Sequence, residues 1–292
     1  MGLLLFGAVG RIVYALPLME KKLTKDHLRL IYSATHDQQW INRTARQVYY
    51  NIGKNAFDAV WLSQATPQQF NRVVTWDAAE LEKVKVAHAK GRGVVIITSH
   101  LGCFELILQI FSRQGMASFA VGQRLYDERL DAMVRDLRSG PNIAYLYRNN
   151  SARDIVRFLQ EGRLFCVLVD QDTAVDSLFA PFLGVPAYSP FSAVKMALRF
   201  NVPAFVATTA RQRDNTHRYF IEGPLSFERS DNEQYDLARG VAMANAKIGA
   251  TIQQFPEQWV WMHRRWRRRP DDPAYSHIVN VDAIANTKKQ PV

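Results

Sequence analysis

The chain has 292 residues, of which 48% are hydrophobic and 22% charged, and its formal net charge is +10 at pH 7. This composition excludes a disordered or fibrous protein, and two cysteines exclude a disulfide framework. The positive charge predicts attraction to an acidic partner, which can be a nucleic acid, an anionic membrane surface or an acidic carrier protein.

An apolar run at residues 2–18 opens the chain; Arg11 interrupts it and Pro17 closes it. It is too short for a membrane-spanning helix, and in a secretory signal the basic residues would come before the apolar run rather than after it. We therefore expect an amphipathic helix in the membrane interface, or alternatively a helix packed into the core. The cations expected to face lipid phosphates are Arg11, Lys21, Lys22 and Lys25.

Helical periodicity continues over residues 26–63, and a further helix is predicted from a cap at Asp77 to Lys90. Beyond it, strand and helix signals alternate. Strands are predicted at 93–98, 117–122, 143–147, 164–170, 203–208 and 218–222. Helices are predicted at 102–114, 127–138, 151–161, 190–200 and 233–254. This alternation predicts an α/β fold with a mixed, largely parallel sheet covered by helices.

Three parts are expected along the chain. They are an N-terminal helical, membrane-facing segment (1–76), an α/β domain (77–272) and a loosely ordered tail (273–292).

A histidine and a glutamate follow the first strong strand. Residues 98–105 read Thr-Ser-His-Leu-Gly-Cys-Phe-Glu, directly after the apolar run 93–97. His100 then lies at the carboxyl end of a strand, where α/β sheets gather their ligands. Glu105, one turn into the next helix, can turn back toward the imidazole, and a histidine held by an acid can take a proton from a hydroxyl. The alternative is a helix-capping histidine beside an unrelated glutamate.

The two cysteines have different expected roles. Cys103, within the same run, raises a competing hypothesis in which its thiol is a nucleophile and forms a covalent enzyme intermediate. Cys166 lies in an apolar run and is expected to be inert core.

Arginines follow the second predicted strand. Arg124 comes at its end, and Arg135 and Arg138 lie on the next helix. Arginines near strand ends can hold phosphate by forked hydrogen bonds, the alternative being a solvated basic helix face. Asp170, Gln171 and Asp172 end a later apolar strand and can orient an arginine or line an acceptor pocket. No further ligand follows at metal-binding spacing, so we expect no metal site.

Two more segments lack a regular periodicity. Residues 179–187 read Phe-Ala-Pro-Phe-Leu-Gly-Val-Pro-Ala and are interpreted as an exposed binding loop, or alternatively a buried crossover. Residues 256–270 interleave three tryptophans with five arginines. That mixture favours a membrane interface; it is also compatible with stacking on single-stranded nucleic acid, or with a basic helix end whose tryptophans pack into the core.

In this order, these segments resemble the late acyltransferases of lipid A biosynthesis, the lauroyl and myristoyl acyltransferase family within the lysophospholipid acyltransferase superfamily. The resemblance covers roughly residues 1–272. It rests on His-Leu-Gly-Cys-Phe-Glu at 100–105, Asp-Gln-Asp at 170–172, Phe-x-Pro-Phe-x-Gly-x-Pro-Ala at 179–187 and Pro-Glu-Gln-Trp-x-Trp-x-His-Arg-Arg at 256–265.

The resemblance implies a glycerol-3-phosphate acyltransferase-like fold. It also implies transfer of a fatty acyl chain from acyl carrier protein, or sometimes coenzyme A, to a hydroxyl of a lipid A precursor. The reaction would take place at the cytoplasmic face of the bacterial inner membrane, with no cofactor, and no nucleic-acid partner is expected. The alternatives are acyl transfer to another lipid hydroxyl (of a phospholipid, ornithine lipid or mannosylated lipid) and a non-catalytic membrane or nucleic-acid binding protein.

The resemblance also suggests roles for individual residues. His100 and Glu105 match the family's catalytic dyad, Arg138 looks like its arginine after the second strand, and Asp170 matches its later aspartate. Backbone N–H groups of Leu101 and Gly102, at the expected helix start, are candidates for stabilising the oxyanion. The substrate-binding candidates are Arg124, Arg138, Asp170, Gln171 and Arg264.

The chain departs from the family pattern between the two dyad residues. The family often has Gly-Asn-Trp where this sequence has Gly102, Cys103 and Phe104. The acceptor is therefore the part of the reaction that we expect to differ.

Overall fold

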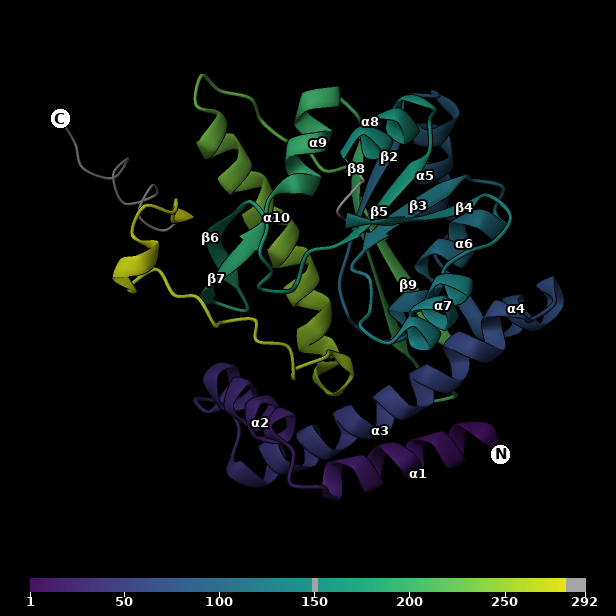
Figure 1. The fold of residues 1–292 in the computed structure, drawn as a ribbon, viewed down its shortest axis with the longest axis vertical. Coiled ribbons are helices and arrows are strands. Elements are labelled where there is room, and N and C mark those ends of the chain that lie inside the picture. Colours follow the sequence, from purple (N-terminus) through teal and green to yellow (C-terminus); the bar gives the residue numbers. More distant parts are fainter. Residues whose placement is uncertain (149–151, 282–292) are drawn as a thin grey trace. The chain divides into compact units, whose positions relative to one another are not determined.

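The computed structural model describes residues 1–148 and 152–281 of the chain (Figure 1). Within it the chain forms two compact units. The first unit comprises Met1–Lys54, Val169–Lys195 and Ser226–Val292, and the second comprises Asn55–Leu168 and Met196–Leu225. The three-part division expected from the sequence stays a prediction. Of the expected tail, residues 282–292 lie outside the described residues.

A seven-stranded sheet in the order β1-β9-β8-β2-β5-β3-β4 forms the centre of the second unit (Figure 1). Its strands are β1 (Val74–Trp76), β2 (Val94–Thr98), β3 (Ser118–Gly122), β4 (Ile143–Tyr147), β5 (Leu164–Leu168), β8 (Ala204–Arg211) and β9 (His217–Glu222). Neighbouring strands are parallel except for β8 and β9, which pair antiparallel. Every residue of β2 and β8 is buried, as expected for strands with both faces covered. The expected mixed, largely parallel sheet is confirmed.

Helices cover this sheet. They are α4 (Pro67–Val73), α5 (Ala78–Ala89), the 3₁₀ turn η1 (Phe104–Leu106), α6 (Ile107–Arg113), α7 (Glu128–Leu137) and α8 (Ala152–Gln160). The predicted cap at Asp77 is present, since its side chain accepts hydrogen bonds from the backbone of Ala79 and Glu80. The core below the sheet contains the fully buried Phe70, Ile96 and Phe111.

The first unit consists largely of helices. They are α1 (Gly2–Ala15), α2 (Met19–Tyr32), the first part of α3 (Gln38–Ser63), the start of α9 (Ser192–Phe200) and α10 (Glu233–Gln254), with the 3₁₀ turns η3 (Pro256–Gln258) and η4 (Pro273–Tyr275). A two-stranded hairpin, β6 (Ser177–Phe182) and β7 (Val185–Pro190), completes it, and α10 packs along β6 (Figure 1).

The hairpin corrects the expectation for residues 179–187. They form two paired strands rather than a loop, and Phe179, Phe182 and Ala187 are buried. Leu183 and Gly184, both with positive φ, make the two-residue turn. Residues 179–187 show no periodic sequence pattern, but pairing of the two strands satisfies their backbone hydrogen bonds.

Three glycines bring α1 against α3. A Cβ atom at Gly10 would lie 2.1 Å from the carbonyl oxygen of Tyr49, and one at Gly53 would lie 2.1 Å from that of Phe6. A Cβ atom at Gly7 would meet the ring of Tyr50 at 2.3 Å. The two helices therefore touch backbone to backbone, which only glycine permits at these positions.

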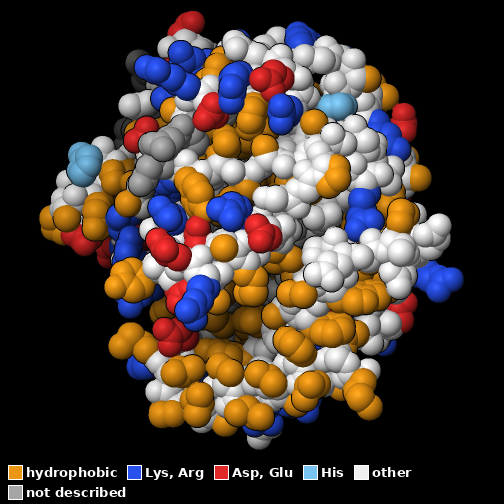
Figure 2. All heavy atoms as spheres, turned by 45° about the vertical axis from the view of Figure 1, so that its right-hand side comes forward, with side chains coloured by type: hydrophobic (Ala, Val, Ile, Leu, Met, Phe, Trp, Pro, Cys, Tyr) orange, Lys and Arg blue, Asp and Glu red, His pale blue; other side chains and the backbone are white. Residues whose placement is uncertain are grey.

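The opposite side of α1 is apolar and exposed. Figure 2 shows hydrophobic side chains gathered along the lower edge of the view, over α1. The exposed apolar side chains of α1 and the turn after it are Leu4, Leu5, Phe6, Val9, Ile12, Leu16 and Leu18. Among the described residues, no single helix has both the length and the apolar content to cross a bilayer. Helices α1 and α2 together meet that test by length and composition, but the chain bends by 91° between them.

Arg11 does not extend from the apolar face of α1. Its guanidinium lies over the ring of Tyr50 on α3, 4.4 Å from the ring centroid. This contact holds the charge of Arg11 beside α3, so the charge does not interrupt the exposed apolar side chains of α1.

Candidate active site

His100 lies two residues after the end of β2, on a turn that leads into η1. Its ring packs edge to face on Phe104, with ring centroids 4.7 Å apart. The predicted helix start at 102 is corrected, since η1 begins at Phe104 and the first α-helical residue is Ile107. The 3₁₀ turn brings Phe104 beside the imidazole within four residues of sequence.

Gly102 gives this turn its direction. Its φ is +58°, in the left-handed region that favours glycine. A Cβ atom here would also lie 2.5 Å from the carbonyl oxygen of Thr209 on β8. Conformation and space thus both require glycine. The backbone N–H groups of Leu101 and Gly102 lie ahead of the first helical residue. They are therefore not at the helix start where they were expected to stabilise an oxyanion.

Cys103 is buried and held from two sides. Its thiol donates to the backbone carbonyl of Asn55 (3.6 Å), and its own carbonyl accepts from the hydroxyl of Tyr219 (3.1 Å). Burial raises the pKa of the Cys103 thiol well above its ordinary value. Because the thiolate is the nucleophile, these contacts favour a packing role over the hypothesis of a covalent intermediate. Cys166 is buried too, as expected.

Glu105 and Arg138 form a two-pronged ion pair. Arg138 Nε donates to Glu105 Oε2 (2.8 Å), and the adjacent NH2 group donates to Oε1 (2.6 Å). Both side chains are about four-fifths buried, with 22% and 20% of their surface exposed. Burial by itself would lower the pKa of Arg138, but the hydrogen bonds and charge of Glu105 raise the pKa above its ordinary value. The pair therefore fixes the orientation of the Glu105 carboxylate.

Tyr145, on β4, supports the other side of Arg138. Its hydroxyl accepts from Arg138 NH1 (2.9 Å). Gly122, at the end of the neighbouring strand β3, makes room for this ring, since a Cβ atom there would overlap the Tyr145 hydroxyl at 1.7 Å. The sequence had singled out Glu105 and Arg138 separately, and the structure brings them together.

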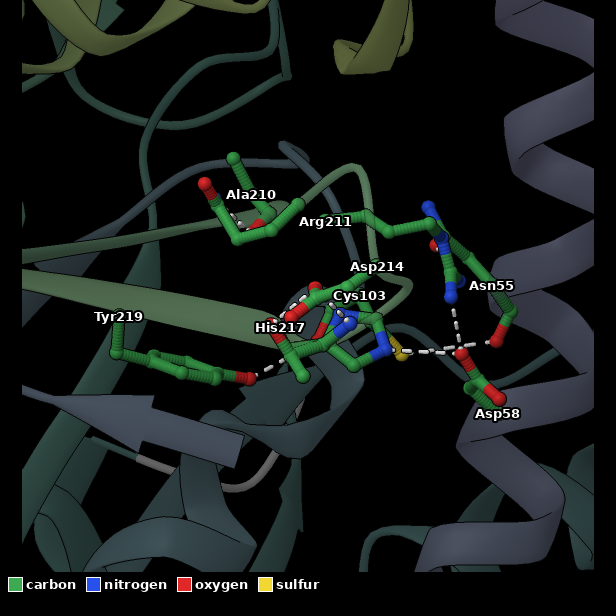
Figure 3. A network of polar contacts seen from close by, with 10 residues as sticks. Asn55, Asp58, Cys103, Ala210, Arg211, Asp214, His217 and Tyr219 are labelled. Atoms are coloured by element: carbon green, nitrogen blue, oxygen red, sulfur yellow. Dashed lines mark hydrogen bonds and ion pairs between the residues drawn. The ribbon is translucent and has the colours of Figure 1, made fainter. Parts of the chain in front are cut away.

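A buried charge network lies beside Cys103 (Figure 3). One carboxylate oxygen of Asp58, on α3, accepts from Arg211 NH1 (2.6 Å) and from His217 Nε2 (2.8 Å). Arg211 NH2 donates to the side chain of Asn55 (2.7 Å). Burial would raise the pKa of Asp58, but hydrogen bonds from His217 and Arg211 hold it below its ordinary value.

This network reaches the turn through Asn55, which binds Arg211 with its side chain and the Cys103 thiol with its carbonyl. Sequence reasoning missed it. The available signal was the position of Arg211 and His217 on either side of the β8–β9 turn, where Arg211 ends a strand that is buried throughout.

Arg124 lies after β3 at the surface. Its side chain is 68% exposed and forms a weak ion pair with Glu128 at 3.6 Å, so it is accessible to a ligand.

The acidic strand end belongs to the first unit, where it meets the tryptophan-rich segment. Asp170 is fully buried and accepts from Trp259 Nε1 (2.7 Å), while Gln171 Nε2 donates to His263 Nε2 (2.8 Å). Asp172 pairs with Arg268 (2.6 Å). Two motifs distant in sequence are therefore joined by hydrogen bonds.

The three tryptophans of residues 256–270 are core residues. Trp259, Trp261 and Trp266 are buried, which corrects their expected place at a membrane interface. Arg265 is buried with them, donating to the carbonyl of Tyr188 (2.6 Å), and burial lowers its pKa to about 10. Arg264 is exposed and lines a cavity beside α2.

Comparison with known proteins agrees with the resemblance seen in the motifs. Residues 4–268 match the family described as bacterial lipid A biosynthesis acyltransferase. Two relatives, the lipid A biosynthesis palmitoleoyltransferase of Escherichia coli strain K12 and the lipid A biosynthesis acyltransferase of Shigella flexneri, are 30% identical over 207 residues. The match covers 68% of this chain and spans 64% of each relative. The lipid A biosynthesis lauroyltransferase of Escherichia coli strain K12 is 23% identical over 206 residues, 68% of this chain and 65% of its own.

Proposed function

Because the chain belongs to the bacterial lipid A biosynthesis acyltransferase family, we propose that it transfers a fatty acyl chain from an acyl thioester to a hydroxyl of a lipid A precursor. The observation that carries the proposal is the turn after β2. There His100 is followed by Glu105, to which Arg138 donates two hydrogen bonds. The names of the relatives, palmitoleoyl- and lauroyltransferase, support fatty acyl chains as the transferred group.

His100 acts as the general base. A thioester is already activated, so no enzyme nucleophile is needed. The acceptor hydroxyl oxygen attacks the thioester carbonyl while His100 takes its proton. When the tetrahedral intermediate collapses, the carbon–sulfur bond breaks and the imidazolium returns the proton to the leaving thiolate. Glu105 orients the imidazole and stabilises its charged form, as the acid of a serine triad does.

Arg138 serves this centre by holding the Glu105 carboxylate in place. Its three hydrogen bonds to Glu105 and Tyr145 use three of the five guanidinium N–H groups. The other two are suited to a phosphate oxygen of the acceptor, and exposed Arg124 is suited to a second contact. Asp170 and Gln171 stay proposed substrate-binding residues, and their bonds to Trp259 and His263 fix their own side chains. Backbone N–H groups of Leu101 and Gly102 remain the candidates for the oxyanion.

The donor and the location follow from charge and from α1. A net charge of +10 suits acyl carrier protein, which is acidic, and an anionic membrane surface. The exposed apolar side of α1 suits insertion into one leaflet (Figure 2). We propose peripheral attachment at the cytoplasmic face of the inner membrane, through α1.

The test is an acyl-transfer assay with labelled acyl carrier protein and a panel of acceptors: a lipid A precursor, a phospholipid, an ornithine lipid and a mannosylated lipid. His100→Ala is expected to lower the rate by about 10³-fold, in the range of general-base catalysis. Arg138→Lys keeps the charge but cannot form the two parallel hydrogen bonds to Glu105, and we expect the transfer rate to fall about tenfold. The control Arg135→Lys, on the exposed face of α7, is expected to keep the rate.

Transfer that persists in both His100→Ala and Glu105→Gln would overturn the catalytic assignment. Transfer only to a lipid outside the lipid A pathway would overturn the acceptor while leaving the chemistry in place.

A further inference from the structure

A cavity of about 520 Å³ lies in the first unit between α2 and residues 264–269. We name it the α2 cavity. Its α2 side has the apolar Met19, Leu23 and Leu30, and besides them Lys22, Asp26 and His27. Its other side is cationic, with Arg264, Arg267 and Arg269. Such a division matches a molecule with an anionic group at the end of an apolar part.

The cations around the α2 cavity are not all neutralised by the protein. Lys22 pairs with Asp26 (2.7 Å), and Arg267 pairs with Asp172 (3.0 Å). Arg264 and Arg269 are exposed, and neither has a carboxylate within 4.0 Å in the described part of the chain. Two guanidinium groups on one wall are thus available to an anion, and guanidinium geometry matches phosphate.

Trp266 adds a second, independent sign of a polar ligand. This side chain lines the α2 cavity and is nearly fully buried. Its indole N–H is buried and finds no hydrogen-bond acceptor among the described residues. An unpaired buried donor costs free energy, and an anion in the cavity can supply the missing acceptor.

The α2 cavity lies next to the apolar surface that starts on α1. Leu16, Leu18 and Met19 connect the end of α1 to the cavity, and all three are exposed. Met19 belongs to both the apolar surface and the cavity lining. A lipid whose chains lie along α1 would therefore present its headgroup at the cationic wall.

We propose that the α2 cavity binds the phosphate of a lipid headgroup. Arg264 and Arg269 hold the phosphate oxygens by charge-assisted hydrogen bonds, and Leu23 and Leu30 contact the first carbons of the lipid. The source of the phosphate is either a bilayer phospholipid or the phosphorylated glycolipid acceptor. Binding requires no acyl donor, so the proposal can fail or hold separately from acyl transfer.

The experiment measures binding of the full chain to phosphatidylcholine vesicles that carry equal negative charge from one of three lipids. These are phosphatidylglycerol, a phosphorylated glucosamine-disaccharide lipid, and oleate, whose carboxylate controls for charge without phosphate. We expect about tenfold tighter binding to at least one phosphate lipid than to oleate, as one additional charged hydrogen bond gives. Preference for phosphatidylglycerol identifies a bilayer source, and preference for the disaccharide lipid alone identifies the acceptor.

Three variants locate the preference. Arg264→Gln with Arg269→Gln removes the two cations, and Leu30→Trp fills the α2 cavity without changing charge. Both are expected to abolish the preference for phosphate over carboxylate. The matched control, Arg43→Gln with Arg46→Gln, removes two exposed cations of α3 outside the cavity and is expected to keep it.

Two results would overturn the proposal: equal binding of the unaltered chain to phosphate and carboxylate vesicles, or a control that loses the preference as fully as the cavity variants. Unfolding midpoints establish that each variant is folded. Leu23→Trp repeats the cavity filling should Leu30→Trp unfold, and a preference retained by the folded filling variant would equally reject the site.

Discussion

At the scale of single residues, the backbone of Gly102 fixes the path between His100 and Glu105. Its positive φ turns the chain, and its missing side chain lets the turn lie against Thr209. The next residue, Cys103, is fixed by Asn55 and Tyr219. The two side chains assigned to catalysis are therefore separated by residues with little freedom to move.

Gly102→Ala is expected to lower the free energy of unfolding by about 3 kcal/mol, the sum of left-handed strain and a clash with the Thr209 carbonyl. The control is Gly115→Ala. Gly115 also has positive φ (+79°), but a Cβ atom added there would have nothing within 4 Å, so we expect a loss of about 1 kcal/mol. Urea unfolding monitored by tryptophan fluorescence measures both. Equal losses would contradict the role given to the contact with Thr209.

At the scale of elements, Asp58, Arg211 and His217 tie α3 to the β8–β9 hairpin. All three side chains are buried, so the charges of Asp58 and Arg211 depend on each other and on the hydrogen bond between Asp58 and His217. Since the same cluster contacts the Cys103 turn through Asn55, α3 and the hairpin together support the strand end that holds His100.

Asp58→Asn is expected to cost about 3 kcal/mol of unfolding free energy at pH 7, because it leaves the buried Arg211 without its carboxylate. The folded pKa of Asp58 is depressed, so its contribution is fully present above its unfolded pKa and is lost as pH falls through the folded pKa. The difference between the unaltered chain and Asp58→Asn should therefore shrink below about pH 4.

Urea unfolding at pH 7 and pH 3 measures this difference. Asp136→Asn, at a side chain that is 77% exposed, is the control and should change stability by less than about 0.5 kcal/mol at either pH. A difference for Asp58→Asn that stays constant with pH would refute the assigned charge role.

The elements also show what sequence alone can predict. Apolar runs predicted β2 and β5 because a strand buried on both faces needs apolar residues throughout. The β6–β7 hairpin was missed because its prolines and glycine hide the strand pattern and its backbone partners lie across a turn. The Asp58 network was missed for a related reason. Its carboxylate lies about 150 residues from Arg211 in sequence, and no local pattern encodes such a pairing.

The candidate site was predicted in part. His100, Glu105 and Arg138 were singled out because each lies near a strand or helix end in a run with a recognisable pattern. The ion pair between Glu105 and Arg138 was not predicted, because it depends on Tyr145 and on the room left by Gly122. Sequence located the chemical groups, and packing determined their partners.

At the scale of the whole molecule, the proposed membrane attachment would use both the positive charge and the apolar helix α1. The net charge of +10 attracts the chain to anionic surfaces over several ångströms, while the exposed side chains of α1 act only on contact. Charge would therefore bring the protein to the membrane, and α1 would keep it there.

Ile12→Asp tests the second step. Ile12 is 64% exposed on α1, and replacing it by a charged residue should weaken binding to anionic vesicles at least about tenfold while leaving stability unchanged. Val86→Asp makes the same change at a residue of α5 that is 52% exposed. Vesicle co-sedimentation compares the two variants. If Val86→Asp loses as much binding as Ile12→Asp, the effect comes from net charge and not from the apolar surface of α1.

The glycine seam between α1 and α3 has a consequence for the protein away from any membrane. Gly7, Gly10 and Gly53 dock α1 through its backbone, so Leu5, Val9 and Ile12 take no part in holding it. The exposed apolar surface that they form is a permanent feature of the folded chain and does not depend on a ligand. In aqueous buffer we expect that surface to favour association with detergent, with added lipid or with another copy of the chain, so purification conditions should affect whether the protein stays dispersed.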